Sequence, residues 1–318
     1  TRCLYCSFTS YPIGVYKDKV DAYLDTMEKE MEYIAESYTE KKLASIYIGG
    51  GTPSSISAEQ MDRLCSMIEK HFDLSQVREY TIEAGRPDST TADKLQVMKA
   101  HGVDRISINP QTMNGETLKL IGRAHTPEQA EEAFMRAREA GFDNINMDLI
   151  VGLPGEDAEM VKRTLEKVKK LAPESLTVHT LAIKRAAHLK QEMDKYSFAG
   201  DVDEQLSLVG QAAEELGLAP YYLYRQKNMA GNLENVGYAR HGLECLYNIL
   251  IMEERTDIIG IGAGSSSKLI RREGDLDPVT GETITGNRID RVENCKSVDD
   301  YIARIDEMID RKKQAFAK

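Results

Sequence analysis

The sequence lacks several features that would assign it to a common class of protein. No apolar run approaches the roughly 18 residues that a membrane-spanning helix needs, so we expect no membrane span. Positive charge is scarce, because 52 aspartates and glutamates outnumber 41 lysines and arginines and leave a net charge of −11. So acidic a chain is a poor candidate for binding nucleic acid over its surface. Five cysteines in 318 residues are too few for a disulfide scaffold and indicate a reducing cytoplasm.

The composition is otherwise that of a globular protein with a sizeable core, with 41% hydrophobic and 29% charged residues. Five short runs rich in β-branched and apolar residues predict strands. They are Ser45–Ile48, Tyr80–Ala84, Arg105–Asn109, Asn144–Ile150 and Ser175–Ala182.

Helical patterns lie between these runs. An apolar stripe at helical spacing extends from Val20 to Ile34. A capping box, Ser57 with Gln60, predicts a second helix start, and Thr126 with Gln129 predicts a third.

The alternation of strands and helices predicts an α/β fold with a parallel sheet and helices outside it. Five units are visible, and one further strand expected before Thr1 would complete a partial (β/α)6 barrel. After about residue 190 the alternation weakens, which indicates a smaller C-terminal α+β region. We therefore expect two domains, residues 1–190 and 191–318.

The segment Cys3-Leu4-Tyr5-Cys6 is a C-x-x-C motif. A zinc half-site, a thioredoxin-type redox pair, an iron–sulfur loop and two plain core cysteines all remain open. No second cysteine pair follows at zinc-finger spacing, and the residues after Cys6 do not start a helix, so the iron–sulfur loop is favoured. The iron–sulfur loop would need three thiolates and this segment supplies two, so we expect the third just upstream of Thr1.

Two further features point to a ligand at the carboxyl ends of the strands. Gly49-Gly50-Gly51 follows the first strand and exposes backbone groups to a small polar ligand, although a tight turn is the alternative. Four polar residues stand at or near other strand ends, namely Glu83, Asn109, Gln111 and Asp148. Each alone suits a structural role, but four at one rim indicate an active site at the mouth of the barrel.

In this order, these motifs resemble the radical S-adenosylmethionine (SAM) enzymes of the oxygen-independent coproporphyrinogen III oxidase group, and most of all their HemZ branch. The segments that carry the resemblance are Cys3–Cys6, Gly49–Pro53, Glu83, Arg105–Gln111, Ile121–His125 and Asn146–Gly155. The resemblance is strong over residues 1–190 and weak beyond them.

The resemblance implies a [4Fe-4S] cluster and SAM as cofactors. Cys3 and Cys6 match the second and third ligands of the family loop C-x3-C-x2-C, whose first ligand would fall before Thr1. The residues that match SAM contacts are Tyr5, Gly50, Gly51, Thr52, Glu83, Gln111, Arg123, Asp148 and Ala182.

The activity implied is the oxidative decarboxylation of coproporphyrinogen III to protoporphyrinogen IX in haem biosynthesis, which makes the protein an oxidoreductase. Its expected partners are this tetrapyrrole and an electron donor. Residues 191–318 would cover the substrate. A tetra-anionic substrate needs cations, and we expect Arg225 and Lys227, which follow the aromatic run Tyr221–Tyr224, to contact it; Arg240 and His241 are further candidates.

Two departures from the family pattern leave alternatives open. Phe8 stands where some members carry a fourth cysteine, which weakens the decarboxylase interpretation. The related haem chaperones carry a His-Asn-x-x-Tyr-Trp motif, of which Glu234–Ala239 keeps only Asn235 and Tyr238. A haem-binding chaperone and a radical SAM enzyme with another substrate are therefore the alternatives.

Overall fold

The computed structural model describes residues 3–5, 13–37, 42–181, 200–224, 234–278 and 280–316. The chain forms two compact units. We call the first the sheet unit; it comprises Thr1–Pro12, Ser45–Met61 and Arg78–Leu246. The second, the hairpin unit, comprises Ile13–Ala44, Asp62–Val77 and Tyr247–Lys318. The domain boundary near residue 190 stays a prediction.

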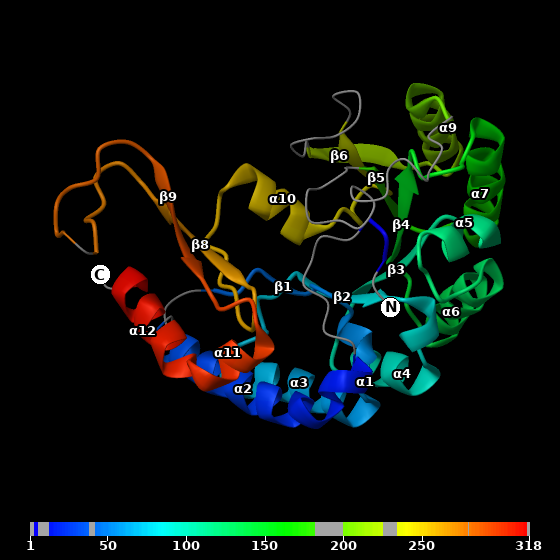
Figure 1. Cartoon of the computed structure of the whole chain (residues 1–318). Coiled ribbons are helices and arrows are strands. Elements are labelled where there is room, and N and C mark those ends of the chain that lie inside the picture. Colours follow the sequence, from blue (N-terminus) through cyan, green and yellow to red (C-terminus); the bar gives the residue numbers. More distant parts are fainter. Residues whose placement is uncertain are drawn as a thin grey trace. The chain divides into compact units, whose positions relative to one another are not determined.

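The sheet unit contains one curled, seven-stranded sheet (Figure 1). Its first five strands run parallel in chain order: β1 (Ser45–Ile48), β2 (Glu79–Gly85), β3 (Arg105–Gln111), β4 (Ile145–Val151) and β5 (Ser175–Thr180). Strand β7 (Asn235–Ala239) then pairs antiparallel with β5, and β6 (Ala219–Tyr224) forms the edge beside β7. The five parallel strands and the half-barrel curl confirm the predicted fold class, and the antiparallel pair is an addition that the sequence did not predict.

Helices of the sheet unit follow the strands and lie along the outer side of the sheet (Figure 1). They are α4 (Ala92–Ala100), α5 (Gly115–Leu120), α6 (Pro127–Glu139), α7 (Ala158–Leu171) and α9 (Val202–Glu215), with 3-10 turns η2 (Pro53–Ser55) and η3 (Pro87–Ser89). Both predicted capping boxes are confirmed. The Gln129 backbone N–H donates to Thr126 Oγ1 at 3.3 Å, and the Thr126 N–H donates to Gln129 Oε1 at 2.9 Å. Ser57 and Gln60 exchange the same two bonds at 3.1 Å before α3 (Ala58–His71).

The two faces of the parallel strands differ in chemistry. Alternate side chains point to opposite faces of a strand, and the outer set, such as Ile82, Ile106 and Met147, is apolar and fully buried. The inner set is polar. Asn146 is at its centre: its Nδ2 donates to Ser107 Oγ at 2.8 Å, and its Oδ1 accepts from Thr177 Oγ1 at 3.1 Å. Ser107, Asn146 and Thr177 therefore satisfy one another across β3, β4 and β5.

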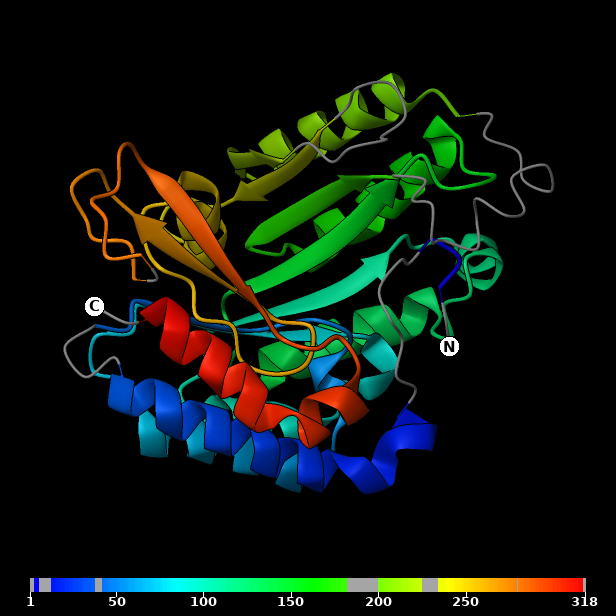
Figure 2. The same ribbon diagram turned by 60° about the vertical axis from the view of Figure 1, so that its left-hand side comes forward.

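The hairpin unit joins helices to a two-stranded ribbon. Its elements are α1 (Ile13–Tyr16), η1 (Lys17–Lys19), α2 (Val20–Ser37), β8 (Ser266–Arg271), β9 (Arg288–Glu293), α11 (Val298–Ala303) and α12 (Ile305–Phe316), and α10 (Leu246–Glu253) begins at its boundary. The predicted stripe on α2 is buried at Val20, Leu24, Met31 and Ile34. Helix α12 lies along α2 (Figure 2), where Tyr33 stacks on Phe316 with ring centroids 6.4 Å apart. None of the helices in the described ranges is both long enough and apolar enough to cross a membrane.

A buried ion pair fixes the hairpin unit. Glu30 of α2 and Lys312 of α12 have side chains 0% and 1% exposed, and Lys312 Nζ donates to Glu30 Oε1 at 2.6 Å. Asn294 Nδ2 donates to the same oxygen at 2.8 Å, and the Gly262 N–H donates to Glu30 Oε2 at 2.9 Å. Tyr301 also donates to Glu30. Because a buried charge is costly without partners, the carboxylate ties four chain segments together.

We predict that Lys312→Met lowers the free energy of unfolding by roughly 3–5 kcal/mol, since it leaves the buried Glu30 carboxylate without its counter-charge. Urea unfolding measures the effect. The matched control is Lys313→Met, because Lys313 is 57% exposed and its contacts with Asp310 and the Tyr33 ring lie at the surface. Equal stability of the two variants would show that the pair does not hold the unit.

Candidate functional site

The three glycines after β1 have two different environments. A Cβ atom on Gly49 would lie 2.5 Å from Tyr47 Cε1 and 2.9 Å from Glu83 Oε1, closer than real contacts allow. A Cβ on Gly50 or Gly51 would meet nothing within 4 Å, and Gly50 has φ +117°, in the region that favours glycine. The first glycine therefore packs against side chains, and the other two expose backbone to open space.

The glycine segment is fastened to the neighbouring strand. Thr52 Oγ1 donates to the Gly51 carbonyl at 2.8 Å, and the Ser55 N–H donates to the Thr52 carbonyl at 3.0 Å. Ser54 is fully buried, and its hydroxyl donates to the Ala84 carbonyl at the end of β2 at 2.6 Å. The turn into η2 is thus held against β2 while Gly50 and Gly51 stay uncovered.

Glu83 lies on the inner face of β2, packed against Gly49, and accepts a hydrogen bond from Tyr47 of β1. Burial raises the pKa of Glu83 to about 7, and nearby Asp148 adds to the rise. The Tyr47 hydrogen bond, Arg105 and His179 act in the opposite direction. Near neutral pH this carboxyl therefore exists in both protonation states.

Asp148 lies on the inner face of β4. Its Oδ1 accepts from Asn146 Nδ2 at 2.6 Å, and its Oδ2 lies 3.9 Å from Nε2 of His179 on β5. The side chain keeps 18% of its surface exposed. Asp148 therefore has free acceptor capacity beside a second carboxyl group, Glu83.

Gln111 is the last residue of β3, and Arg123 follows that strand at the same edge of the sheet. Gln111 is buried and has φ +70°, a strained backbone for a residue other than glycine, of the kind that concentrates at functional sites. An NH2 group of Arg123 donates to the Asn109 carbonyl at 3.3 Å. Its Nε is buried and has no partner in the described part of the chain. Burial, and secondly the Arg123 charge, lower the pKa of nearby His125 to about 4, so its ring is neutral.

The start of the chain is anchored close to these strand ends. The Leu4 N–H donates to the Ile121 carbonyl at 3.0 Å, and Leu4 and Tyr5 pack on a buried apolar cluster that includes Ile150 of β4. Cys3 is a half-buried free thiol. Cys6, Ala182, Arg225 and Lys227 lie outside the described residues, so their roles stay predictions.

The structure corrects the expectation for Arg240 and His241. Strand β7 runs against β5, with Ala239 opposite Ser175, the first residue of β5. Both basic residues follow β7 and are exposed at the amino ends of the parallel strands, on the edge opposite the mouth. Strand β6 ends at Tyr224 on the mouth edge, because Tyr224 pairs with Asn235 at the other end of β7.

Several inner-face residues were missed by the sequence analysis. They are Tyr47, Arg105, Ser107, Asn146, Thr177 and His179. The signal was present, because polar residues recur at every second position of otherwise apolar strands, as in Asn146 and Asp148. Listing every second residue of each strand, counted back from the strand end, would have found most of them.

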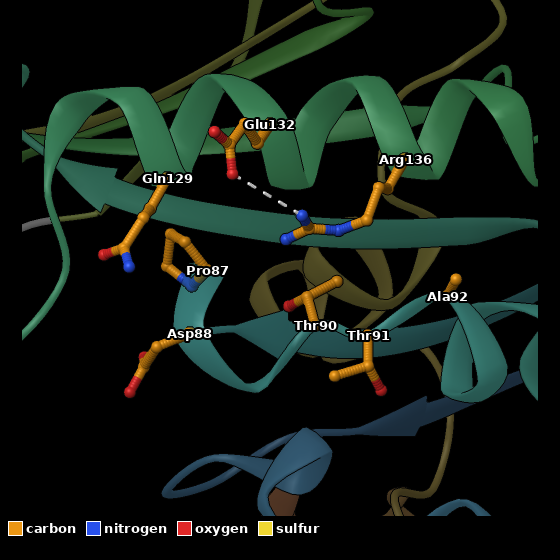
Figure 3. Close-up of a pocket in the computed structure, with 8 residues that line it drawn as sticks. All are labelled: Pro87, Asp88, Thr90, Thr91, Ala92, Gln129, Glu132 and Arg136. Atoms are coloured by element: carbon orange, nitrogen blue, oxygen red, sulfur yellow. Dashed lines mark ion pairs between the residues drawn. The ribbon is translucent and has the colours of Figure 1, made fainter.

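A separate pocket of about 360 Å³ lies on the outer side of the sheet unit, between η3, the start of α4 and α6 (Figure 3). It is lined by Pro87, Asp88, Thr90, Thr91, Ala92, Gln129, Glu132 and Arg136. Arg136 and Glu132 pair across one turn of α6 at 3.8 Å. Because the glycines and the inner carboxyl groups take no part in it, we do not include this pocket in the site.

Comparison with known proteins matches residues 1–168 to the radical SAM superfamily. The chain is 49% identical over 278 residues to the oxygen-independent coproporphyrinogen-III oxidase-like protein HemZ of Bacillus subtilis, covering 86% of this chain and 56% of that protein. It is 33% identical to the heme chaperone HemW of Lactococcus lactis, covering 87% and 69%. The chain thus spans little more than half the length of the HemZ relative.

A solved structure supports the fold. Coproporphyrinogen III oxidase (HemN) from Escherichia coli superimposes with a TM-score of 0.72 over 97% of this chain and 67% of that chain, at 22% identity. At this identity the likeness shows the shared fold, a curled sheet with helices outside it.

We predict that Gly49→Ala and Gly51→Ala differ sharply in stability. The Gly49 variant forces Tyr47 and Glu83 apart, and overpacking of this kind costs roughly 1–3 kcal/mol. The Gly51 variant meets open space and should melt near the wild-type temperature. Thermal unfolding of both proteins without ligand tests this, and a Gly49 variant as stable as the Gly51 variant would refute the packing role.

Proposed function

This chain belongs to the radical SAM superfamily, and from that premise we propose that it binds SAM at the carboxyl ends of β1–β5 and decarboxylates a tetrapyrrole there. Members of the superfamily use a [4Fe-4S] cluster together with SAM. The observation that carries the proposal is the open backbone of Gly50 and Gly51 next to two inner carboxyl groups.

The side chains at this edge suit the chemical groups of SAM. SAM carries an ammonium group, a carboxylate, a sulfonium and two ribose hydroxyls. Glu83 offers a buried acceptor for the ammonium group, and Asp148 suits the ribose hydroxyls. Arg123, with a buried and unpartnered Nε among the described residues, suits the carboxylate of the ligand. Backbone groups of Gly50 and Gly51, with Thr52 and Gln111, would complete the site.

Cys3 and Cys6 would hold the cluster, with Tyr5 next to the nucleoside. When bound, the cluster supplies the electron that lets SAM yield a carbon-centred radical. The chain itself orients SAM through its rim residues and limits the access of water, because Leu4 and Tyr5 pack on the apolar cluster beneath them.

The substrate we propose is coproporphyrinogen III. Its propionate side chain would give a β-hydrogen atom to the radical derived from SAM and one electron to an electron acceptor, and would release carbon dioxide to leave a vinyl group. The HemZ relative is the support for this choice. Residues 1–190 would form the catalytic core and residues 191–318 would cover the substrate. Strand β6 ends at the mouth edge with Tyr224. Arg225 and Lys227, the next basic residues in the sequence, would receive the propionates. An electron donor would serve the cluster in the cytoplasm.

A haem chaperone is the second candidate, favoured by the HemW relative. In this chain, Asn235 of the partial chaperone motif has a structural role. The Asn235 side-chain oxygen accepts from the Thr180 N–H at 3.0 Å, and Asn235 is buried. A side chain that fixes the β5–β7 pairing is a poor haem contact, so the decarboxylase is the better supported function.

We predict that Asp148→Ala weakens SAM binding by roughly 1–3 kcal/mol, the scale of a lost hydrogen bond that involves a charged group. The fold should persist, because alanine leaves no buried charge behind. Calorimetry measures the affinity. Asp143→Ala is the matched control, since Asp143 is an exposed aspartate just before the other end of the same strand. Wild-type affinity in the Asp148 variant would make that residue structural.

We predict that the anaerobically reconstituted holoenzyme, given SAM, a reductant and coproporphyrinogen III, forms vinyl products. Arg225→Glu with Lys227→Glu should raise the KM for the tetrapyrrole and leave uncoupled SAM cleavage nearly unchanged, because the basic pair contacts only the propionates. Separation of the porphyrin products is the assay. Stoichiometric haem binding without any vinyl product would favour the chaperone.

A further inference from the structure

Tyr47 is an inner-face residue that the family resemblance does not assign. It donates a hydrogen bond to Oε1 of Glu83 across the β1–β2 pair, where the two strands are in parallel register. Gly49 packs against both partners, so the space that an alanine methyl would take is filled by the Tyr47 ring and the Glu83 carboxyl group. The phenol and the carboxyl group are thus held together beside Gly49, the residue before the open backbone of Gly50 and Gly51.

The surroundings of this pair decide which group donates the hydrogen bond and which accepts it. Burial, and secondly the Glu83 charge, raise the pKa of Tyr47 well above its ordinary value, so the phenol remains a donor at neutral pH. Four groups from four strands act on Glu83. Asp148 of β4 disfavours its ionised form, whereas Tyr47 of β1, Arg105 of β3 and His179 of β5 favour it.

We propose that Tyr47 is a positioning residue for SAM: its phenol holds Glu83 as an ionised acceptor beside the glycine segment, where the carboxylate accepts hydrogen bonds from the amino group of the ligand. This inference rests on the proposed function. A phenylalanine at position 47 would keep the ring that packs against Gly49 and would remove only the donor. The role is therefore separable from packing.

The sign of the pH dependence follows from the chemistry of the pair. The ionised form of Glu83 is the stronger acceptor for the N–H groups of the ligand's amino group, so SAM affinity should rise as the pH increases through about 7. Without the phenol the pKa of Glu83 is higher, and this ascending limb moves to higher pH.

The experiment is calorimetric titration of SAM into the wild-type protein, Tyr47→Phe, Glu83→Gln and the double variant, from about pH 5.5 to 8.5. Tyr47→Phe should bind about tenfold more weakly at neutral pH, with its ascending limb shifted upward. Glu83→Gln should lose that limb, and the double variant should bind no more weakly than Glu83→Gln. The control is Tyr238→Phe, which removes the hydroxyl of a half-buried tyrosine of β7. The neighbouring Gly237 packs on Tyr222. The control variant should bind SAM with the affinity and pH profile of the wild type.

A ligand-free measurement separates this inference from the proposed function. The folded-state pKa of Glu83 is raised, so its contribution to stability is complete below the unfolded pKa of about 4.5 and is lost as the pH rises through about 7. In Tyr47→Phe this loss should extend to higher pH. A wild-type protein that binds no SAM at any pH overturns the proposed function. A Tyr47 variant whose SAM affinity and pH profile equal those of the wild type overturns the positioning role alone.

Discussion

A polar side chain that is buried on the inner face of the parallel strands costs free energy unless it finds a hydrogen-bond partner. Asn146 meets this requirement by bonding to Ser107 on one neighbouring strand and to Thr177 on the other. A shift of one residue in either pairing would turn these groups toward the helices and bring apolar side chains inward. The hydrogen bonds thus fix the register of β3, β4 and β5. The same register places Asp148 at the mouth, two residues beyond Asn146.

The three glycines after β1 lie in two different environments. Gly49 lacks a side chain because Tyr47 and Glu83 fill that position, whereas Gly50 and Gly51 lack side chains beside open space. Packing therefore accounts for Gly49, whereas ligand contact at Gly50 and Gly51 stays a prediction. Anchoring through Ser54 keeps the uncovered backbone next to the end of β2.

The parts that the sequence predicts well are those specified locally. All five parallel strands lie within two residues of their predicted bounds, because their apolar runs and the capping boxes at Ser57 and Thr126 are short-range signals. The joining of β7 to β5 was not predicted, since pairing between Ser175 and Ala239 depends on contacts distant in sequence. That pairing also explains the misplacement of Arg240: a strand's direction, which sets the edge its last residue reaches, is not encoded locally.

The electrostatics of the mouth narrow the chemistry that it can receive. Glu83 and Asp148 stand on β2 and β4, and each penalises the charge of the other across β3. Arg105 and His179 favour the ionised form of Glu83, but both belong to the strands themselves. A ligand that brings positive charge to the inner face is therefore favoured. Arg123, at the rim after β3, prefers a negative group. A zwitterion with its cationic centres directed inward and its carboxylate toward Arg123 satisfies both requirements. Haem offers propionates, which would add negative charge next to the two inner carboxyl groups. The arrangement of charge therefore supports SAM as the ligand that we propose for the inner mouth.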